Sequence, residues 1–182
     1  LADLEINRHG NQSRYLTCLG EALQILDQPE SAVDCFRHSI QNAAQGATEM
    51  LEGYYGLLTA LDSLGKSSET QLAVCLEALE YFPLDIQLLC AMGGYVQMQG
   101  RLDLAARAYE TAYRHGKINP EIWHLQDAHE IAGVCWSRTL YSQSDPDNAL
   151  TVLEEAVEEN PNSIRLRQAI IDLHVKRGRR NE

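Results

Sequence analysis

One outline of apolar and small residues occurs twice in this chain, the second time 73 residues after the first. The first occurrence consists of Leu16, Leu19, Gly20 and Leu23 followed by Ala32 and Phe36. The second consists of Leu89, Met92, Gly93 and Val96 followed by Ala105 and Tyr109. Self-similarity at a fixed spacing is typical of repeat architectures, and this offset equals two periods of about 34 residues plus about five. The chain is therefore predicted to fold as an array of similar units.

Three further segments fit the same outline. Residues 54–85 form a middle copy, with Gln71 where the other copies have alanine unless the preceding turn is one residue longer. Residues 120–161 form a fourth copy, and its first helix is predicted to be about two turns too long. Residues 163–178 resemble the first half of a fifth copy. Apolar residues recur at helical spacing in every copy, so the sequence predicts helices throughout.

Small residues stand where leucine would bury more apolar surface. Each such alanine gives up apolar area worth about 25 cal/mol per Å². That loss makes sense if Gly93, Ala105 and Ala112 allow another helix backbone to come close, with Tyr109 filling the groove beside them. Prolines at the end of the copies separate the units, because proline interrupts a helix.

The helix-turn-helix copies, with small residues at the crossing, an aromatic residue four positions after the alanine and proline at the end, resemble the tetratricopeptide repeat. The resemblance covers about residues 13 to 178. It implies an all-α fold, a right-handed α-α superhelix (solenoid) of about four repeats plus a terminal helix. The expected organisation is an N-terminal tail or the end of a preceding helix at 1–12 and a repeat domain at 13–182. The approximate repeat units are 13–50, 51–85, 86–119, 120–162 and, incomplete, 163–182.

Composition supports a folded chain and excludes several classes of protein. Of the 182 residues 45% are hydrophobic and 23% are charged, as in an ordinary folded domain. No apolar stretch approaches the roughly 20 residues that a membrane span needs, so no membrane partner is expected. The chain starts at Leu1 without a signal-peptide pattern, and we expect it to be a piece of a longer protein. The net charge of −11 repels phosphate backbones, so no nucleic-acid partner is expected.

The five cysteines include no C-x-x-C pair. Each lies within an apolar helical pattern, and we expect small buried hydrophobic residues in a reducing compartment rather than disulfides. This predicts a cytoplasmic location. The five are Cys18, Cys35, Cys75, Cys90 and Cys135.

The sequence carries no catalytic or metal-binding pattern. His124 and His129 are five residues apart, about 140° round a helix, which does not suit one metal ion. There is no H-E-x-x-H, no glycine-rich phosphate loop after a strand and no G-x-S-x-G element. Nothing marks Cys135 as an activated nucleophile. We therefore expect no metal site, no cofactor and no catalytic residue in this chain.

The resemblance instead implies a concave groove lined by the first helix of each repeat, which would bind a peptide or helix of a partner protein. On the family's register the groove residues are Arg14, Thr17, Glu21 and Gln24; Glu52, Tyr55, Thr59 and Asp62; Gln87, Cys90, Gly94 and Gln97; and Glu121, His124 and Ala128. Arg14 is the only cation among them, so a basic or neutral partner with apolar anchors is expected. The alternative is that such repeats are appended to an enzyme, for example a glycosyltransferase, and position its substrate or dock a domain.

The C-terminal helix has apolar residues on two sides. Leu166, Ile170 and Leu173 follow one face, whereas Ile164, Ile171 and Val175 follow another. A terminal helix in a repeat array needs a polar outer side, so this edge predicts a further helix or weak homo-oligomer formation. The basic residues Lys176, Arg177, Arg179 and Arg180 either complement the helix dipole or dock on an acidic surface.

Overall fold

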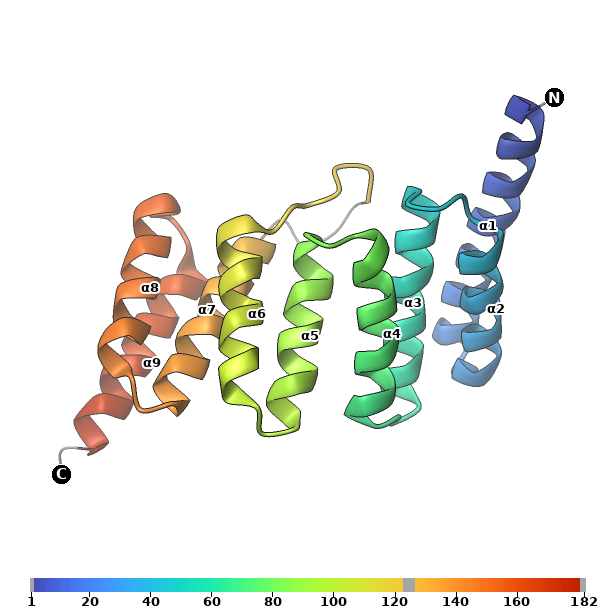
Figure 1. The fold of residues 1–182 in the computed structure, drawn as a ribbon. Helices are drawn as coiled ribbons and strands as arrows, with labels where there is room; N and C mark the ends of the chain where they lie inside the picture. Colours follow the sequence, from blue (N-terminus) through green and yellow to red (C-terminus); the bar gives the residue numbers. More distant parts are fainter. Residues whose placement is uncertain (1, 123–126, 181–182) are drawn as a thin grey trace. The chain divides into compact units, whose positions relative to one another are not determined.

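The computed structural model describes residues 2–122 and 127–180, and these residues form nine α-helices and no strand beyond one isolated bridge between Asp85 and Lys117. The predicted all-α fold of helical repeats is therefore confirmed. The helices fall into two compact units, and within each unit successive helices lie side by side (Figure 1). No helix of the described residues is long and apolar enough to cross a membrane.

The first unit holds two helical hairpins and a short returning segment. Its helices are α1 (Ala2–Ile25), α2 (Pro29–Asn42), α3 (Thr48–Ser63) and α4 (Ser68–Tyr81). Residues 119–122 also belong to it, because the Thr48 hydroxyl at the start of α3 donates a 2.5 Å hydrogen bond to Glu121. The boundary predicted between residues 12 and 13 lies inside α1.

The second unit holds two further hairpins and a last helix. Its helices are α5 (Ile86–Met98), α6 (Leu102–His115), α7 (Ala128–Ser142), α8 (Pro146–Glu159) and α9 (Ile164–Arg180). The fourth repeat was predicted to begin with a lengthened helix at residue 120, and this is wrong. Residues 120–122 are not helical, and α7 has 15 residues, close to the 13 of α5. The additional residues lengthen the connection before α7 instead of the helix.

The four hairpins turn in the same way. Each first helix is followed by one residue with positive φ, and these residues are Asp27 (58°), Gly65 (60°), Gly100 (77°) and Ser144 (68°). The next backbone N–H bonds back to the carbonyl five residues earlier, as from Arg101 to Val96 at 3.0 Å and from Asp145 to Leu140 at 3.0 Å. This arrangement is the Schellman motif, which satisfies carbonyls at a helix end. The shared turn fixes the register of every hairpin.

The second helices of the four hairpins, α2, α4, α6 and α8, each have 14 residues and bury the same positions. Their fourth, eighth and eleventh residues are all buried. The fourth residues are Ala32, Gln71, Ala105 and Ala149; the eighth are Phe36, Cys75, Tyr109 and Leu153; the eleventh are Ser39, Ala78, Ala112 and Ala156. One helix face therefore forms the core in all four repeats.

Glycine on the first helix faces the aromatic residue of the second. A Cβ atom at Gly93 would lie 2.7 Å from the Tyr109 ring, and one at Gly20 would lie 2.7 Å from the Phe36 ring. Ala105 and Ala112, on either side of Tyr109 along α6, are fully buried. The predicted close crossing of small residues beside an aromatic side chain is confirmed.

The second repeat differs from the others in the length of its turn and in having Gln71 at the alanine position. The turn from α3 to α4 has four residues, whereas the other three hairpin turns have three. Gln71 nevertheless occupies the alanine position of α4, is buried and donates from Nε2 to the carbonyl of Lys66 at 2.9 Å. Among the described residues, no donor pairs with its Oε1.

The cysteines differ from the expectation of uniform burial. All five are free thiols, Cys75 is buried, and Cys35, Cys90 and Cys135 are half-buried. Cys18 is exposed on the outer side of α1, because no helix of the first unit covers that side. The expectation of a buried residue at Cys18 is therefore wrong.

Side-chain caps begin several helices. Ser67 accepts from the N–H of Thr70 at the start of α4, and Asp145 accepts from the N–H of Asn148 at the start of α8. Asp85 caps α5 through the N–H of Leu88 at 2.9 Å. These caps satisfy donors that a helix leaves free in its first turn.

Candidate functional site

A polar face runs along α1 and α3 in the first unit, on sides of the helices that do not enter the core. Exposed Arg14 and Glu21 lie on α1, and half-buried Glu52 and Tyr55 lie one turn apart on α3. The same face continues with half-buried Gln24 and with exposed Thr59 and Asp62. None of these residues belongs to the buried core of the unit. We call it the α1–α3 face.

Glu52 shows that the charged residues of the two helices are close together. Burial raises the pKa of its carboxyl group above the ordinary value, Arg14 lowers it, and Glu49 and Glu21 raise it further. Electrostatic interactions of this size require neighbouring groups. The α1–α3 face therefore brings two further carboxylates and one guanidinium group close to Glu52, and it is acidic.

Thr17, also predicted to line the groove, lies elsewhere. It is buried, and its hydroxyl group is 2.7 Å from the hydroxyl of Ser39 on α2. Ser13 completes this group, since its hydroxyl donates to the carbonyl of Ser39 at 2.9 Å. Thr17 thus belongs to the α1–α2 interface and not to a groove, because it lies on the same side of α1 as Gly20.

In the second unit the predicted residues of α5 lie partly in the interior. Burial raises the pKa of the Cys90 thiol to about 12, with smaller contributions from Cys135 and Asp85. Gln97 is exposed, and its Oε1 accepts hydrogen bonds from Tyr109 at 3.3 Å and Thr139 at 3.5 Å. Gln87 and Gly94 are half-buried. Burial shields the Cys90 thiol from solvent, whereas Gln97 lies at the edge of the core.

The predicted residues of the fourth repeat do not line α7. Glu121 lies in the connection before α7 and bonds to Thr48 in the first unit. His124 lies outside the described residues. Ala128, at the first turn of α7, is buried. The cause is the late start of α7, which shifts the register on which these residues were chosen.

A cavity of about 110 Å³ between α7, α8 and α9 contains residues that the sequence analysis did not select. Its apolar floor includes Val134, Leu153 and Leu173. Arg138 and Lys176 also line it, so this part of the second unit carries cations. Arg138 was not found from the sequence, because the register of α7 follows from the turn at Ser144, and the positive φ of this residue is a feature of the structure.

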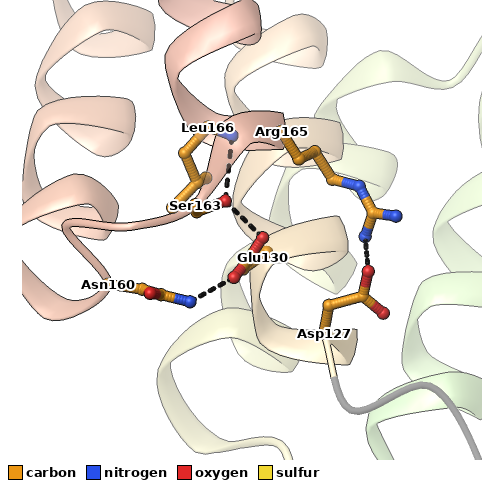
Figure 2. A network of polar contacts seen from close by, with 6 residues as sticks. All are labelled: Asp127, Glu130, Asn160, Ser163, Arg165 and Leu166. Carbon is orange, nitrogen blue, oxygen red and sulfur yellow. Dashed lines mark hydrogen bonds and ion pairs between the residues drawn. The ribbon is translucent and has the colours of Figure 1, made fainter.

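A network of polar contacts joins the start of α7 to the start of α9 (Figure 2). Glu130 accepts hydrogen bonds from Asn160 and from the Ser163 hydroxyl, the latter at 2.5 Å. The Ser163 hydroxyl in turn accepts from the N–H of Leu166 at 3.2 Å, and Arg165 pairs with Asp127. These groups satisfy one another, so the network holds the turn from α8 to α9 in place.

A larger cavity of about 420 Å³ adjoins this network. Besides Glu130 and Asn160 it is lined by Tyr113, Asp127, His129, Ala156, Glu159 and Leu166. The Tyr113 hydroxyl donates to Glu159 at 3.2 Å, and burial followed by Glu159 raises the Tyr113 pKa to about 12. Within the described part of the chain, no group of three or more His, Cys, Asp or Glu residues could hold a metal ion.

Comparison with known proteins shows a likeness in structure. No family model matches the chain, and no curated protein matches it. The structure of Pseudomonas aeruginosa pilF is 14% identical, with a TM-score of 0.70 over 94% of this chain and 71% of that chain. A tetratricopeptide repeat protein from Parabacteroides merdae is 18% identical, with a TM-score of 0.72 over 93% of this chain and 61% of that chain.

A third solved structure is described as a tetratricopeptide repeat protein with an unusual peptide-binding site. This protein, YrrB, is 18% identical, with a TM-score of 0.59 over 82% of this chain and 70% of that chain. At such identities the likeness concerns the fold.

Proposed function

We propose that this chain, whose fold is similar to that of tetratricopeptide-repeat proteins, is a protein-interaction scaffold that holds a basic segment of a partner against the α1–α3 face. The observation that carries the proposal is the gathering of Glu21, Glu49 and the single cation Arg14 around Glu52, which gives three carboxylates against one guanidinium group. This excess of negative charge attracts lysine and arginine side chains and repels acidic tails. YrrB, which shares the fold, has a peptide-binding site, and this supports a peptide as the ligand.

Apolar contacts complete the proposed mode of binding. Tyr55 lies half-buried on the same face as Glu52, and aromatic side chains provide much of the binding energy at protein interfaces. Thr59 uses its hydroxyl group within α3, where it donates to the carbonyl of Tyr55 at 2.9 Å. A partner segment would therefore pair its cations with the carboxylates and place an apolar side chain beside Tyr55.

Titration with short peptides tests the proposal. The probes are a peptide that contains lysine and leucine and a counterpart in which glutamate replaces lysine. Calorimetry at low and at high salt measures the binding of each. We expect only the basic peptide to bind, and to bind more weakly as salt rises. The double variant Glu21→Gln with Glu52→Gln should weaken binding about fivefold, since each exposed ion pair contributes about 0.5 kcal/mol.

The control for this titration is Glu154→Gln with Glu158→Gln. Both residues are exposed on α8, and the change in net charge is the same. An equal loss of affinity in the control would show attraction by the whole acidic chain and would contradict a site on α1 and α3. Binding of the acidic peptide as tight as that of the basic one would also contradict the proposal.

The pH dependence offers an independent test. The pKa of Glu52 is raised in the folded protein, so its carboxylate takes up a proton at a higher pH than an ordinary glutamate as the pH falls. Protonation removes a negative charge that attracts the basic peptide, so affinity should decrease with falling pH. The loss of affinity caused by Glu52 should begin at a higher pH than the loss caused by ordinary carboxylates, and Glu52→Gln should remove it. An unchanged profile would exclude Glu52 from the site.

A further inference from the structure

The outer side of α1 is an uncovered apolar surface. Tyr15, Leu19, Ala22 and Leu26 follow one another at intervals of four, three and four residues, so they form one stripe along the helix. Tyr15 is 67% exposed and Leu26 is 66% exposed. Glu21 is the only charged residue between them, and it lies on the α1–α3 face instead. We call these four residues the α1 stripe.

The outer side of α9 carries a second uncovered apolar stripe. Ile164, Ile171 and Val175 are 84%, 55% and 47% exposed and lie on one side of the helix. Leu166 and Leu173, on the opposite side, are buried within the second unit. We call the three exposed residues the α9 stripe. Most exposed apolar residues of a protein occur singly, whereas the residues of the α1 stripe follow one another at every turn. In the α9 stripe Ile171 and Val175 are one turn apart, and Ile164 lies two turns before Ile171 with Arg167 and Gln168 between them.

The surroundings of the two stripes have opposite charge. The first hairpin, residues 12–43, has four acidic residues (Glu21, Asp27, Glu30 and Asp34) and two basic ones (Arg14 and Arg37). Residues 163–178, which include most of α9, have four basic residues (Arg165, Arg167, Lys176 and Arg177) and one acidic residue (Asp172). Contact between an α1 stripe and an α9 stripe would bring these charges together, whereas contact between two α9 stripes would oppose cations.

Two of the α9 cations are already paired within their own chain. Arg165 pairs with Asp127 at the start of α7, and Arg177 lies 2.8 Å from Asp147 on α8. Arg167 and Lys176 are exposed. Arg167 and Lys176 would therefore provide the attraction to a second chain.

We propose that the chain self-associates head to tail, with the α9 stripe of one copy on the α1 stripe of the next and with Arg167 and Lys176 facing the carboxylates of the first hairpin. Such a contact joins different surfaces of two identical chains, so every copy keeps one free stripe of each kind. Two stripes of three and four side chains bury less than the roughly 1,200 Å² of a stable interface, so association should be weak and should increase with concentration.

Two single variants and their mixture test this arrangement. Leu19→Glu blocks the α1 stripe, and Ile171→Glu blocks the α9 stripe. Both positions are solvent-exposed, and circular dichroism verifies that each variant folds. In sedimentation velocity we expect the unmodified chain to form dimers and larger species as its concentration rises, and each variant alone to remain a monomer. An equal mixture should give one-to-one dimers and nothing larger, because it contains one intact stripe of each kind.

The other outcomes overturn the proposal. If the mixture stays monomeric while the unmodified chain associates, the α1 stripe and the α9 stripe do not bind each other. If either variant alone still associates, the stripe that it blocks is not required. If the unmodified chain is monomeric at every concentration, the stripes do not bind. Met98→Glu is the matched control, since Met98 is 72% exposed at the end of α5 and belongs to neither stripe. This control should associate as the unmodified chain does, and a loss of association would contradict a contact confined to the stripes.

Discussion

Phe36 in the first unit and Tyr109 in the second occupy the same position of the repeat, yet their surroundings differ. A Cβ atom at Gly20 on α1 would lie 2.7 Å from the Phe36 ring, and one at Gly56 on α3 would lie 2.2 Å from it. Phe36 is therefore enclosed by glycines on the helices before and after its own. Tyr109 meets Gly93 on α5 in the same way, and its hydroxyl group lies 3.7 Å from where a Cβ atom at Gly94 on the same helix would stand.

Thiol groups take part in the surroundings of Tyr109. Burial, followed by Cys135 and Cys90, raises the Tyr109 pKa above its ordinary value, and its hydroxyl group reaches Gln97. In these two repeats an aromatic side chain therefore stands against a glycine on the preceding helix, whereas the other two repeats have Cys75 and Leu153 at this position. The following helix is free to present glycine, as in the first unit, or cysteine, as in the second.

The largest expected effect concerns the reactivity of the thiol beside Tyr109. The pKa of Cys90 is raised to about 12, so only about one thiol in ten thousand is a thiolate at a pH of about 8. We expect alkylation of Cys90 in the folded chain to be about a thousandfold slower than in urea, where its pKa is near the ordinary value of about 8.5. Mass spectrometry of iodoacetamide-treated protein measures both rates.

Cys18 provides the internal control for this measurement. It is exposed on α1, and its alkylation should be far less slowed by folding. If Cys90 reacts as fast as Cys18, the second unit opens at Tyr109, and the comparison of two closed aromatic sites does not hold.

The next largest effect is expected for Gly56→Ala. The new Cβ atom would lie 2.2 Å from a fully buried ring, so Phe36 or α3 must move. Such overpacking destabilises by about 1–3 kcal/mol, of which better helix propensity recovers up to about 1 kcal/mol. Urea denaturation measures the loss. Phe36→Leu in the same chain should reduce the cost of Gly56→Ala, because it removes the ring that the methyl group meets.

Gly178→Ala is the matched control for this substitution. It lies inside α9, and no atom lies within 4 Å of the position that its Cβ would take. This variant should gain up to about 1 kcal/mol. Equal effects of Gly56→Ala and Gly178→Ala would show that the two-sided contact of Phe36 is not tight.

The sequence predicted the repeats well because the residues that carry the pattern are those that pack. Gly93, Ala105 and Tyr109 were selected by spacing, and the same residues meet in the core. The predicted groove was less accurate, because polar residues are not constrained by packing and their assignment depends on register. Thr17 bonds to Ser39 inside the first hairpin, which no periodicity reveals.

In the fourth repeat an error in register led to a wrong choice of groove residues. Its groove residues were counted from Pro120, although α7 begins at Ala128. A long connection between repeats has no strong sequence signal, and here it displaced Glu121 into a contact with Thr48. The turn at Ser144, whose positive φ only the structure shows, sets the register of α7, and no glycine marks this turn in the sequence.

A smaller effect is expected at the turns that both units share. Gly65 and Gly100 have φ of 60° and 77°, and no atom lies within 4 Å of where a Cβ would stand. Alanine at either position should cost about 1 kcal/mol, because an L-residue is strained at positive φ and nothing else changes. Equal losses in urea denaturation would show that the turn is energetically the same in the two units. A loss at only one position would show that the other turn adopts a different backbone conformation without cost.

The smallest effect is expected for Ser144→Gly, which reverses that substitution. Ser144 adopts φ of 68°, while its N–H bonds to Tyr141 at 3.0 Å and the next N–H bonds to Leu140 at 3.0 Å. Glycine keeps both hydrogen bonds and relieves strain of about 1 kcal/mol, but it loses about half of that gain to the greater freedom of the unfolded chain. We therefore expect a net gain of about 0.5 kcal/mol, measured by urea denaturation. Ser142→Gly, in the last turn of α7, is the control and should lose about 0.5–1 kcal/mol, because helical φ favours serine over glycine. If Ser144→Gly also destabilises, the serine at positive φ is not strained, and the glycines of the other turns are not required for their backbone freedom.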